Sequence, residues 1–203
     1  MAQLTPQFFQ TILAIEGGFQ IHPGDTGNYC QGQLVGTKYG MSAVAVSAWW
    51  GRCPSEDEMR NLTTDDAKAF YAWYFDRYNL FGIESQQFFE LLANNAMGSP
   101  ANAAKVAQRS LNQFGYNVSV DGAIGPQTLA ALNDAWERHG AKIYNAIREA
   151  WVEYLQGLNR PEFIEGWMYR MNKYFPSISE AGVSVGLVLV LAVIGYVILK
   201  KRA

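Results

Sequence analysis

The sequence predicts a mainly α-helical protein with a small loop or β-hairpin region after its first helix and a transmembrane helix at its C-terminus. Three observations predict this fold class. Apolar residues recur at helical spacing through most of the chain. Glycine-rich residues 19–40 interrupt that pattern and favour loops or short hairpin strands. Residues 181–199 are continuously apolar and long enough to cross a bilayer as a helix.

The first helix has local signals at both ends. Thr5 is a typical N-cap residue, and Pro6 suits the first helical position, where its missing N–H costs nothing. Gly17 and Gly18 end the helix, since glycine tolerates the left-handed backbone of a helix C-terminus. Helical spacing predicts further helices over residues 41–50, 63–79, 86–96, 101–114, 125–139 and 142–159.

The charges divide the chain into two unlike parts. Residues 1–180 carry all 18 acidic side chains and 13 of the 16 basic ones, a net charge of −5, whereas residues 181–203 carry three bases and no acid. An acidic body lacks the basic surface that binds phosphates, so nucleic acid is not an expected partner.

The two cysteines do not form a metal-binding pattern. Neither Cys30 nor Cys53 has a second cysteine or a histidine at ligand spacing, so we expect no metal site and no cofactor. Two interpretations of the pair remain open. They form a disulfide in an oxidising compartment, or they are free thiols.

The apolar C-terminal segment has the length of a membrane span. As a helix, its 19 uncharged residues, 181–199, would extend about 28 Å, close to the roughly 30 Å hydrocarbon thickness of a bilayer. Lys200, Lys201 and Arg202 follow at once, which predicts a single-pass protein with its C-terminus on the cytoplasmic side, or on the interior side of another membrane. A buried terminal helix or strand is the alternative. The N-terminus lacks the charged and long apolar regions of a secretory signal.

Glu16 is the first candidate for acid–base chemistry. It is the only carboxylate among the first 24 residues and lies at the end of the first helix, directly before two glycines. Phe9, Ile12 and Glu16 follow one another at spacings of three and four, so Glu16 lies on the apolar stripe. Burial and the negative end of the helix dipole both favour the protonated form that a general acid needs. An exposed glutamate at a helix end is the alternative, with equal weight.

Asp25 and Thr37 are the next candidates, and both lie in the glycine-rich region. Two carboxylates joined by a turn can face each other across a cleft, and such pairs carry out glycoside hydrolysis. Asp25 in its Pro-Gly-Asp context is also a common turn former. The Thr37 hydroxyl is able to hold a water or a sugar, although threonine in such loops is commonly structural.

Three short motifs follow one another in the first 42 residues: EGGF at 16–19, PGDTG at 23–27 and TKYGMS at 37–42. Their order resembles the signature of glycoside hydrolase family 108, a family of bacterial and phage N-acetylmuramidases. The resemblance implies a lysozyme-like helical domain with Glu16 as the catalytic acid. It also implies Asp25 and Thr37 as the other members of the Glu, Asp and Thr arrangement of phage-type lysozymes.

The resemblance extends into the second half of the chain and suggests a domain division. The VDGAIGPQTLAAL segment at 120–132 is similar to an element of the family's peptidoglycan-binding C-terminal half. Residues 1–98 are therefore expected to be the catalytic region and residues 99–176 a helical peptidoglycan-binding half packed on it. Residues 177–203 would hold the joint and the membrane helix.

Five further residues are candidates for holding substrate. Tyr39, Tyr74 and Tyr78 could stack on sugar rings. Where the family has an Asp and an Asn in a DxxVNxG stretch, this sequence reads ANNAMGSP at 93–100. Asn94 or Asn95 is the expected substitute, and an altered cleft at this place is the alternative.

The resemblance and the apolar tail together predict a membrane-anchored peptidoglycan hydrolase. Its activity would be that of an N-acetylmuramidase (lysozyme), which cleaves the β-1,4 bond between N-acetylmuramic acid and N-acetylglucosamine. The expected partners are peptidoglycan glycan strands, the lipid bilayer around residues 181–199 and other virion proteins. The virion hypothesis, a lytic protein of a phage with an internal membrane, arises because the wall-degrading domain is tethered to a membrane. A membrane-bound bacterial or prophage lysozyme is its alternative.

Two other functions stay open at this point. A lytic transglycosylase can work with a single glutamate. A catalytically silent, membrane-anchored wall-binding protein would keep the same fold without activity.

Overall fold

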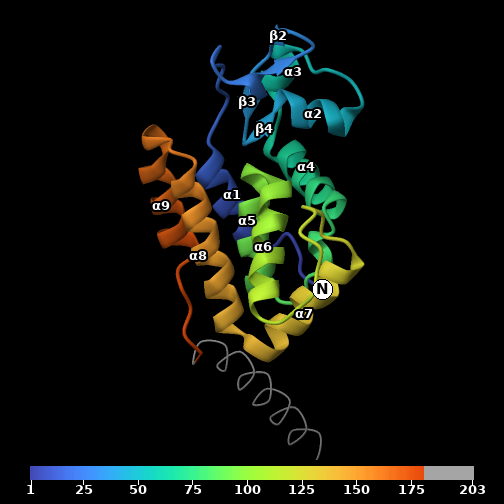
Figure 1. Ribbon diagram of the computed structural model, residues 1–203. Coiled ribbons are helices and arrows are strands. Elements are labelled where there is room, and N and C mark those ends of the chain that lie inside the picture. The colour runs from blue at the N-terminus through green and yellow to red at the C-terminus, as the bar shows by residue number, and fades with distance from the viewer. Residues whose placement is uncertain (181–203) are drawn as a thin grey trace, which may run out of the picture. The chain divides into compact units, whose positions relative to one another are not determined.

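A computed structural model describes residues 1–180 of the chain and is mainly helical, with two small two-stranded sheets in that part (Figure 1). The chain divides into two compact units. Unit 1 is Met1–Pro100, and the described part of unit 2 is 101–180. Each unit is described by itself.

Unit 1 contains five of the described helices: α1 (Pro6–Glu16), α2 (Ala43–Trp50), α3 (Glu56–Asn61), α4 (Thr64–Arg77) and α5 (Gln86–Gly98). The limits of α1 are as predicted. The Thr5 hydroxyl accepts a hydrogen bond from the N–H of Phe8, and Gly17 ends the helix at a φ of 69°. Phe8, Phe9 and Ile12 form its buried face.

Two β-hairpins follow α1. Loops or short hairpin strands were the prediction for residues 19–40, and the structure has strands there, with β4 just beyond that range. Strand β1 (Tyr29–Cys30) pairs with β2 (Gln33–Leu34), and β3 (Thr37–Lys38) pairs with β4 (Met41–Ser42), both antiparallel. In Figure 1 the β2, β3 and β4 strands gather with α2 and α3 at one end of unit 1. Strand β3 places Thr37, one of the predicted catalytic residues, at this end.

The prediction of a helix over residues 41–50 was wrong at its start. Met41 and Ser42 pair with β3, and the helix begins only at Ala43. The Ser42 hydroxyl caps the helix by accepting from the N–H of Ala45 at 3.2 Å. Helical spacing cannot separate a two-residue strand from the helix that directly follows it.

The core of unit 1 is an aromatic cluster from three helices. Phe8 of α1, Phe75 of α4 and Phe89 of α5 have ring centroids 5.6–6.3 Å apart. All three are buried. The cluster therefore fixes the helix that ends in Glu16 against the helical framework of unit 1.

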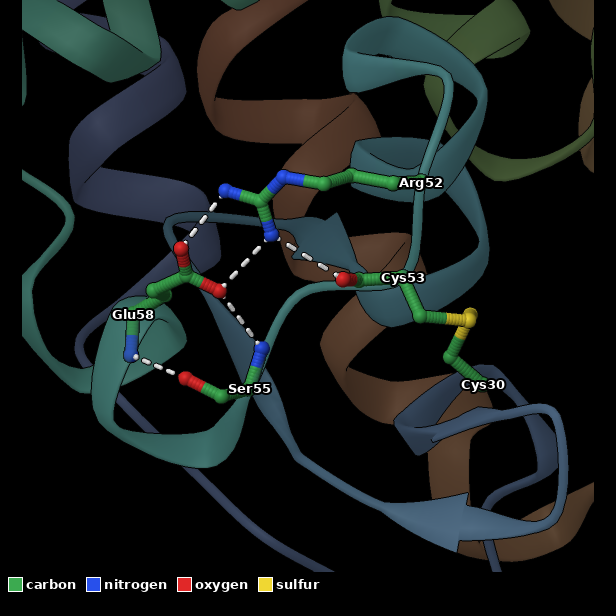
Figure 2. The surroundings of a disulfide bond; sticks show 5 residues. All are labelled: Cys30, Arg52, Cys53, Ser55 and Glu58. Carbon is green, nitrogen blue, oxygen red and sulfur yellow. Dashed lines mark hydrogen bonds and ion pairs between the residues drawn. A yellow bond between two sulfur atoms is a disulfide. The ribbon is translucent and has the colours of Figure 1, made fainter.

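A disulfide joins Cys30 to Cys53, with a Cα–Cα distance of 5.7 Å (Figure 2). The bond connects β1 to the segment after α2, which are 23 residues apart in sequence. By constraining the unfolded chain, such a bond stabilises the folded state by about 3 kcal/mol. Of the two interpretations left open by the sequence, the structure shows the paired one.

The segment next to the disulfide is held by a second set of contacts, also drawn in Figure 2. Arg52 donates to both carboxylate oxygens of Glu58, at 2.6 and 3.0 Å, and to the carbonyl of Cys53. Ser55 and Glu58 form a capping box at the start of α3. The hydrogen bond from Arg52, followed by that from the Ser55 N–H, lowers the pKa of Glu58 to about 2.

Unit 2 is helical throughout its described part. It contains α6 (Pro100–Gln113, whose first residue is the last of unit 1), α7 (Pro126–His139), α8 (Ala141–Gly157) and α9 (Pro161–Tyr174). Helices α7 and α8 pack together, as do α8 and α9 (Figure 1). The helix α9 was not among the predicted elements.

The segment after α9 is bound to α8. Arg148 donates to the carbonyl of Phe175 at 2.7 Å, and the Asn145 side chain exchanges two hydrogen bonds with the backbone of Ile178. Among residues 1–180, no helix is both long and apolar enough to cross a membrane. The predicted span at 181–199 lies outside the described residues, so it stays a prediction.

Candidate active site

Glu16 is half-buried at the last position of α1 and packs against a hairpin turn. The β3–β4 hairpin turns at Tyr39 and Gly40. A Cβ atom at position 40 would lie 2.7 Å from Cγ of Glu16 and 2.8 Å from its Oε2. Only glycine leaves room for the glutamate there. The turn of the TKYGMS motif thus lies against the glutamate side chain of the EGGF motif.

The turn itself requires an unusual backbone. Tyr39 and Gly40 both have positive φ, at 51° and 74°, a combination typical of two-residue hairpin turns. The hydroxyl of Tyr71, from α4, donates to the carbonyl of Tyr39 at 2.9 Å. This bond joins the turn to the helical framework of unit 1.

Thr37 lies in β3, three residues before Gly40. Its backbone exchanges two hydrogen bonds of 2.8 Å with the backbone of Gln20, which ties the strand to the segment after EGGF. The side chain is only 8% exposed, and its hydroxyl has no hydrogen-bond partner among the described residues. A buried hydroxyl without a partner costs free energy, and a buried water is the group that could satisfy it.

Asp25 occupies an exposed position in the loop between α1 and β1. It caps the short 3-10 helix η1 (Thr26–Asn28) by accepting from the N–H of Gly27 at 2.9 Å. Its other oxygen accepts from the side-chain amide of Asn28 at 2.7 Å. These contacts of Asp25 are those of a turn former, as the sequence allowed.

Two contacts connect the Asp25 loop to the β3–β4 hairpin. Asn28 is fully buried, and its carbonyl accepts from the N–H groups of Val35 and Gly36, just before β3. A Cβ atom at Gly27 would lie 3.4 Å from Cβ of Ser42 in β4. Glu16, Thr37 and the Asp25 loop are thus all attached to one hairpin.

The predicted tyrosines lie partly exposed. The Tyr74 hydroxyl donates to the carbonyl of Ala96 at 3.0 Å, and burial, followed by the neighbouring Tyr78, raises the pKa of Tyr74. The rings of Tyr74 and Tyr78 meet edge to face with centroids 4.8 Å apart. Tyr39 forms the hairpin turn beside Glu16 and has Lys38 over its ring. Sugar stacking by these rings stays a prediction.

Asn94 and Asn95 are in the interior of α5, where they are 3% and 1% exposed. The amide of Asn94 donates to the side-chain oxygen of Asn95 at 3.2 Å. Side chains at this depth offer almost no surface to a glycan, so substrate contact by these two residues stays a prediction that their burial disfavours. Within residues 1–180, no three His, Cys, Asp or Glu side chains come together in a way that could hold a metal ion.

Comparison with known families identifies the region that contains this site. Residues 9–96 match the model described as Glycosyl hydrolase 108, and this range includes all three motifs. Residues 9–96 belong to glycosyl hydrolase family 108. The family-108 region ends just before residues 102–172, which match a model described as Predicted Peptidoglycan domain. The two matches together span most of the described chain.

A solved structure is similar to both parts of the chain. The structure of SagA from Brucella abortus matches with a TM-score of 0.66 and 27% sequence identity. The match covers 86% of this chain and 96% of that one. No curated protein is significantly similar to the sequence.

Gly40, Tyr71 and Asn28 are residues of the site that the sequence analysis missed. The pair Tyr39-Gly40 between short polar and apolar runs is a hairpin-turn signal that could have placed Gly40. Tyr71 carries no such signal. It lies 32 residues after Tyr39, and only the packing of α4 brings its hydroxyl to the turn.

Proposed function

We propose that this chain is a peptidoglycan hydrolase of the N-acetylmuramidase (lysozyme) type. It cleaves the β-1,4 bond between N-acetylmuramic acid and N-acetylglucosamine. The observation that carries this proposal is the half-buried Glu16 packed under the Tyr39–Gly40 turn, within a region that belongs to family 108. A lysozyme-like arrangement of unit 1 is part of the same proposal.

Glu16 is the proton donor in the proposed reaction. A glycosidic oxygen is a poor leaving group, so bond breaking requires a carboxylic acid within hydrogen-bond reach of that oxygen. The location of Glu16 at the C-terminus of α1 favours its protonated form, because the helix dipole is negative there.

In the proposed reaction, Asp25 and Thr37 act on the sugar ring and on the attacking water. The exposed carboxylate of Asp25 stabilises the positive charge that develops on the sugar ring or orients the attacking water. The Thr37 hydroxyl, which has no partner among the described residues, is suited to hold that water. Tyr39, next to Glu16, is the best-placed candidate for sugar stacking.

Unit 2 supplies affinity for the wall in this proposal. The match of residues 102–172 to a predicted peptidoglycan domain supports this role. Binding through a second unit keeps the catalytic unit at a high local concentration of glycan strands.

The proposal also includes the cellular location. The apolar residues 181–199 and the bases that follow support a membrane-anchored enzyme with its C-terminus on the cytoplasmic or interior side. We place it in a virion with an internal membrane. Detection of the chain in the detergent-soluble lipid fraction of purified virions would support this location, and its absence from virions would leave a bacterial or prophage membrane.

Product analysis tests the proposed reaction. The full chain in detergent is incubated with purified cell walls, and the released fragments are characterised by mass spectrometry. We expect new reducing N-acetylmuramic acid ends. Terminal 1,6-anhydro products would instead identify a lytic transglycosylase. Absence of any cleavage, with the protein still bound to the walls, would identify a wall-binding protein without activity.

A further inference from the structure

Two oxygen atoms from distant parts of unit 1 approach the same point of the hairpin turn. A Cβ atom at Gly40 would lie 2.5 Å from the Tyr71 hydroxyl oxygen and 2.8 Å from Oε2 of Glu16. The two groups therefore lie close together on one side of Gly40. Any movement of the turn would change the space in which the Glu16 carboxyl group sits.

Tyr71 is itself held rigidly. Its side chain is 2% exposed, and its ring packs against Phe70 and Phe75 at centroid distances of 5.3 and 5.6 Å. A side chain at this depth has little rotamer freedom and cannot contact a glycan on the surface. Its hydroxyl is therefore a fixed point of the helical framework.

The turn depends on an external contact of this kind. Only two residues on each side pair in the β3–β4 hairpin, and two-stranded hairpins are marginal on their own. Tyr39 is a non-glycine residue at positive φ, which costs energy unless the surroundings impose it. The hydrogen bond of 2.9 Å from the Tyr71 hydroxyl to the Tyr39 carbonyl supplies such a constraint.

We infer that Tyr71 is a positioning residue for Glu16. Its hydroxyl fixes the Tyr39–Gly40 turn, and the turn fixes the carboxyl group beneath it. The inference rests on the proposed role of Glu16 as proton donor. Proton transfer requires the donor to lie within hydrogen-bond reach of the leaving oxygen, so a small displacement lowers the rate of the chemical step.

The Tyr71→Phe variant tests the inference because it removes the hydroxyl and keeps the ring. We expect kcat on purified wall glycan to fall about tenfold or more, while KM changes less than about twofold. A second substrate distinguishes positioning from a general loss of structure. An N-acetylglucosaminyl-N-acetylmuramic acid glycoside of 2,4-dinitrophenol has a good leaving group that needs little protonation, so its hydrolysis should fall much less.

A matched control separates positioning from stability. Ser85→Ala removes the N-cap of α5 in the same unit, far in sequence from the hairpin. Both variants are assayed well below their measured melting temperatures. Ser85→Ala should leave both substrates at wild-type rates.

A second variant keeps the inference testable if Tyr71→Phe folds poorly. Gly40→Ala places a methyl group against the Tyr71 hydroxyl and the Glu16 carboxyl without removing any tyrosine. It tests the second step of the inference, that the turn fixes the carboxyl group: the same selective loss on wall glycan is expected, and wild-type activity would contradict that step.

Two results would overturn the role of Tyr71: wild-type kcat on wall glycan in Tyr71→Phe, or an equal loss on both substrates. Failure of the proposed function looks different: either the wild-type chain releases no reducing ends from wall glycan, or Glu16→Gln releases them at the wild-type rate, whatever Tyr71→Phe does.

Discussion

Two glycines at positive φ lie beside polar side chains: Gly40 in the β3–β4 turn of unit 1 and Gly122 in the loop before α7 of unit 2. The polar side chains have different roles in the two loops. In unit 2, the fully buried Gln108 accepts from the N–H of Gly122. Its amide nitrogen contacts Asp121, the carbonyl of Ala123 and the hydroxyl of Thr128 at 2.7–3.2 Å. Every polar atom of the Gln108 side chain is therefore used to hold the loop.

In unit 1, by contrast, a polar group of the hairpin has no partner. The Thr37 hydroxyl is buried without a hydrogen bond among the described residues. Unsatisfied buried groups are rare in proteins because they cost free energy, and they concentrate where chemistry takes place. The Gln108 contacts thus form a structural brace of the unit 2 loop, whereas the unit 1 hairpin keeps a buried hydroxyl without a partner among the described residues.

The largest expected effect on stability comes from removing the brace in unit 2. Gln108→Ala removes four polar contacts of a fully buried side chain and takes a partner from the buried Thr128 hydroxyl, so we expect a loss of about 3 kcal/mol in the free energy of unfolding of this unit. Urea unfolding measures it. Gln127→Ala, which removes one exposed hydrogen bond to the Asn117 carbonyl, is the matched control and should cost far less. Equal stability of the two variants would contradict the brace.

Two matched threonine variants test the difference between the two loops. Thr37→Val removes a hydroxyl without a partner, so we expect unchanged or slightly higher stability but a rate on wall glycan at least about tenfold lower. Thr128→Val removes a hydroxyl bonded to Gln108, so we expect a loss of about 1 kcal/mol and unchanged activity per folded molecule. Thermal unfolding and reducing-end assays measure both. The reverse pattern would show that the two loops have been assigned the wrong roles.

The smallest expected effect is an acid dependence of the unit 2 loop. Hydrogen bonds from the Ala123 N–H and the Gln108 amide lower the pKa of Asp121 below its usual 3.8. A lowered folded-state pKa contributes stability that is present above 3.8 and is lost as the pH falls through the folded value. Asp121→Asn should therefore flatten the decline in stability below about pH 4, whereas Glu149→Gln, an exposed control, should leave it unchanged. The contribution is small because Asp121 is exposed to solvent screening.

The parts of the fold that follow from neighbouring residues could be predicted from sequence. The limits of α1 depend on Thr5 and Gly17, and both were predicted correctly because a cap acts on the helix next to it. The start of α2 could not be predicted, because Met41 and Ser42 are strand residues only through their pairing with β3. Helix α3 has six residues, too few for a helical period to emerge, although its Ser55–Glu58 capping box is visible in the sequence.

The candidate site also has features set by neighbouring residues, which could be predicted, and features set by contacts between distant segments, which could not. Glu16 stood out because its position is set by the helix it ends, and its half-buried location is consistent with the predicted apolar stripe. The hydrogen-bonding state of Thr37 and the contact of Tyr71 with Tyr39 depend on how α4 and the hairpin pack. No spacing rule reports such contacts, since they join segments that are far apart in sequence.

The most direct test of the central claim, that Glu16 performs the chemistry of unit 1, compares Glu16→Gln with Glu149→Gln. Both variants exchange one carboxyl for an amide, one under the Tyr39–Gly40 turn and one on the exposed surface of α8. We predict that Glu16→Gln lowers the release of reducing ends from purified walls by at least about 100-fold, with an unchanged melting temperature and unchanged binding to walls. Glu149→Gln should match the wild type. Reducing-end release at the wild-type rate by folded Glu16→Gln would contradict the account.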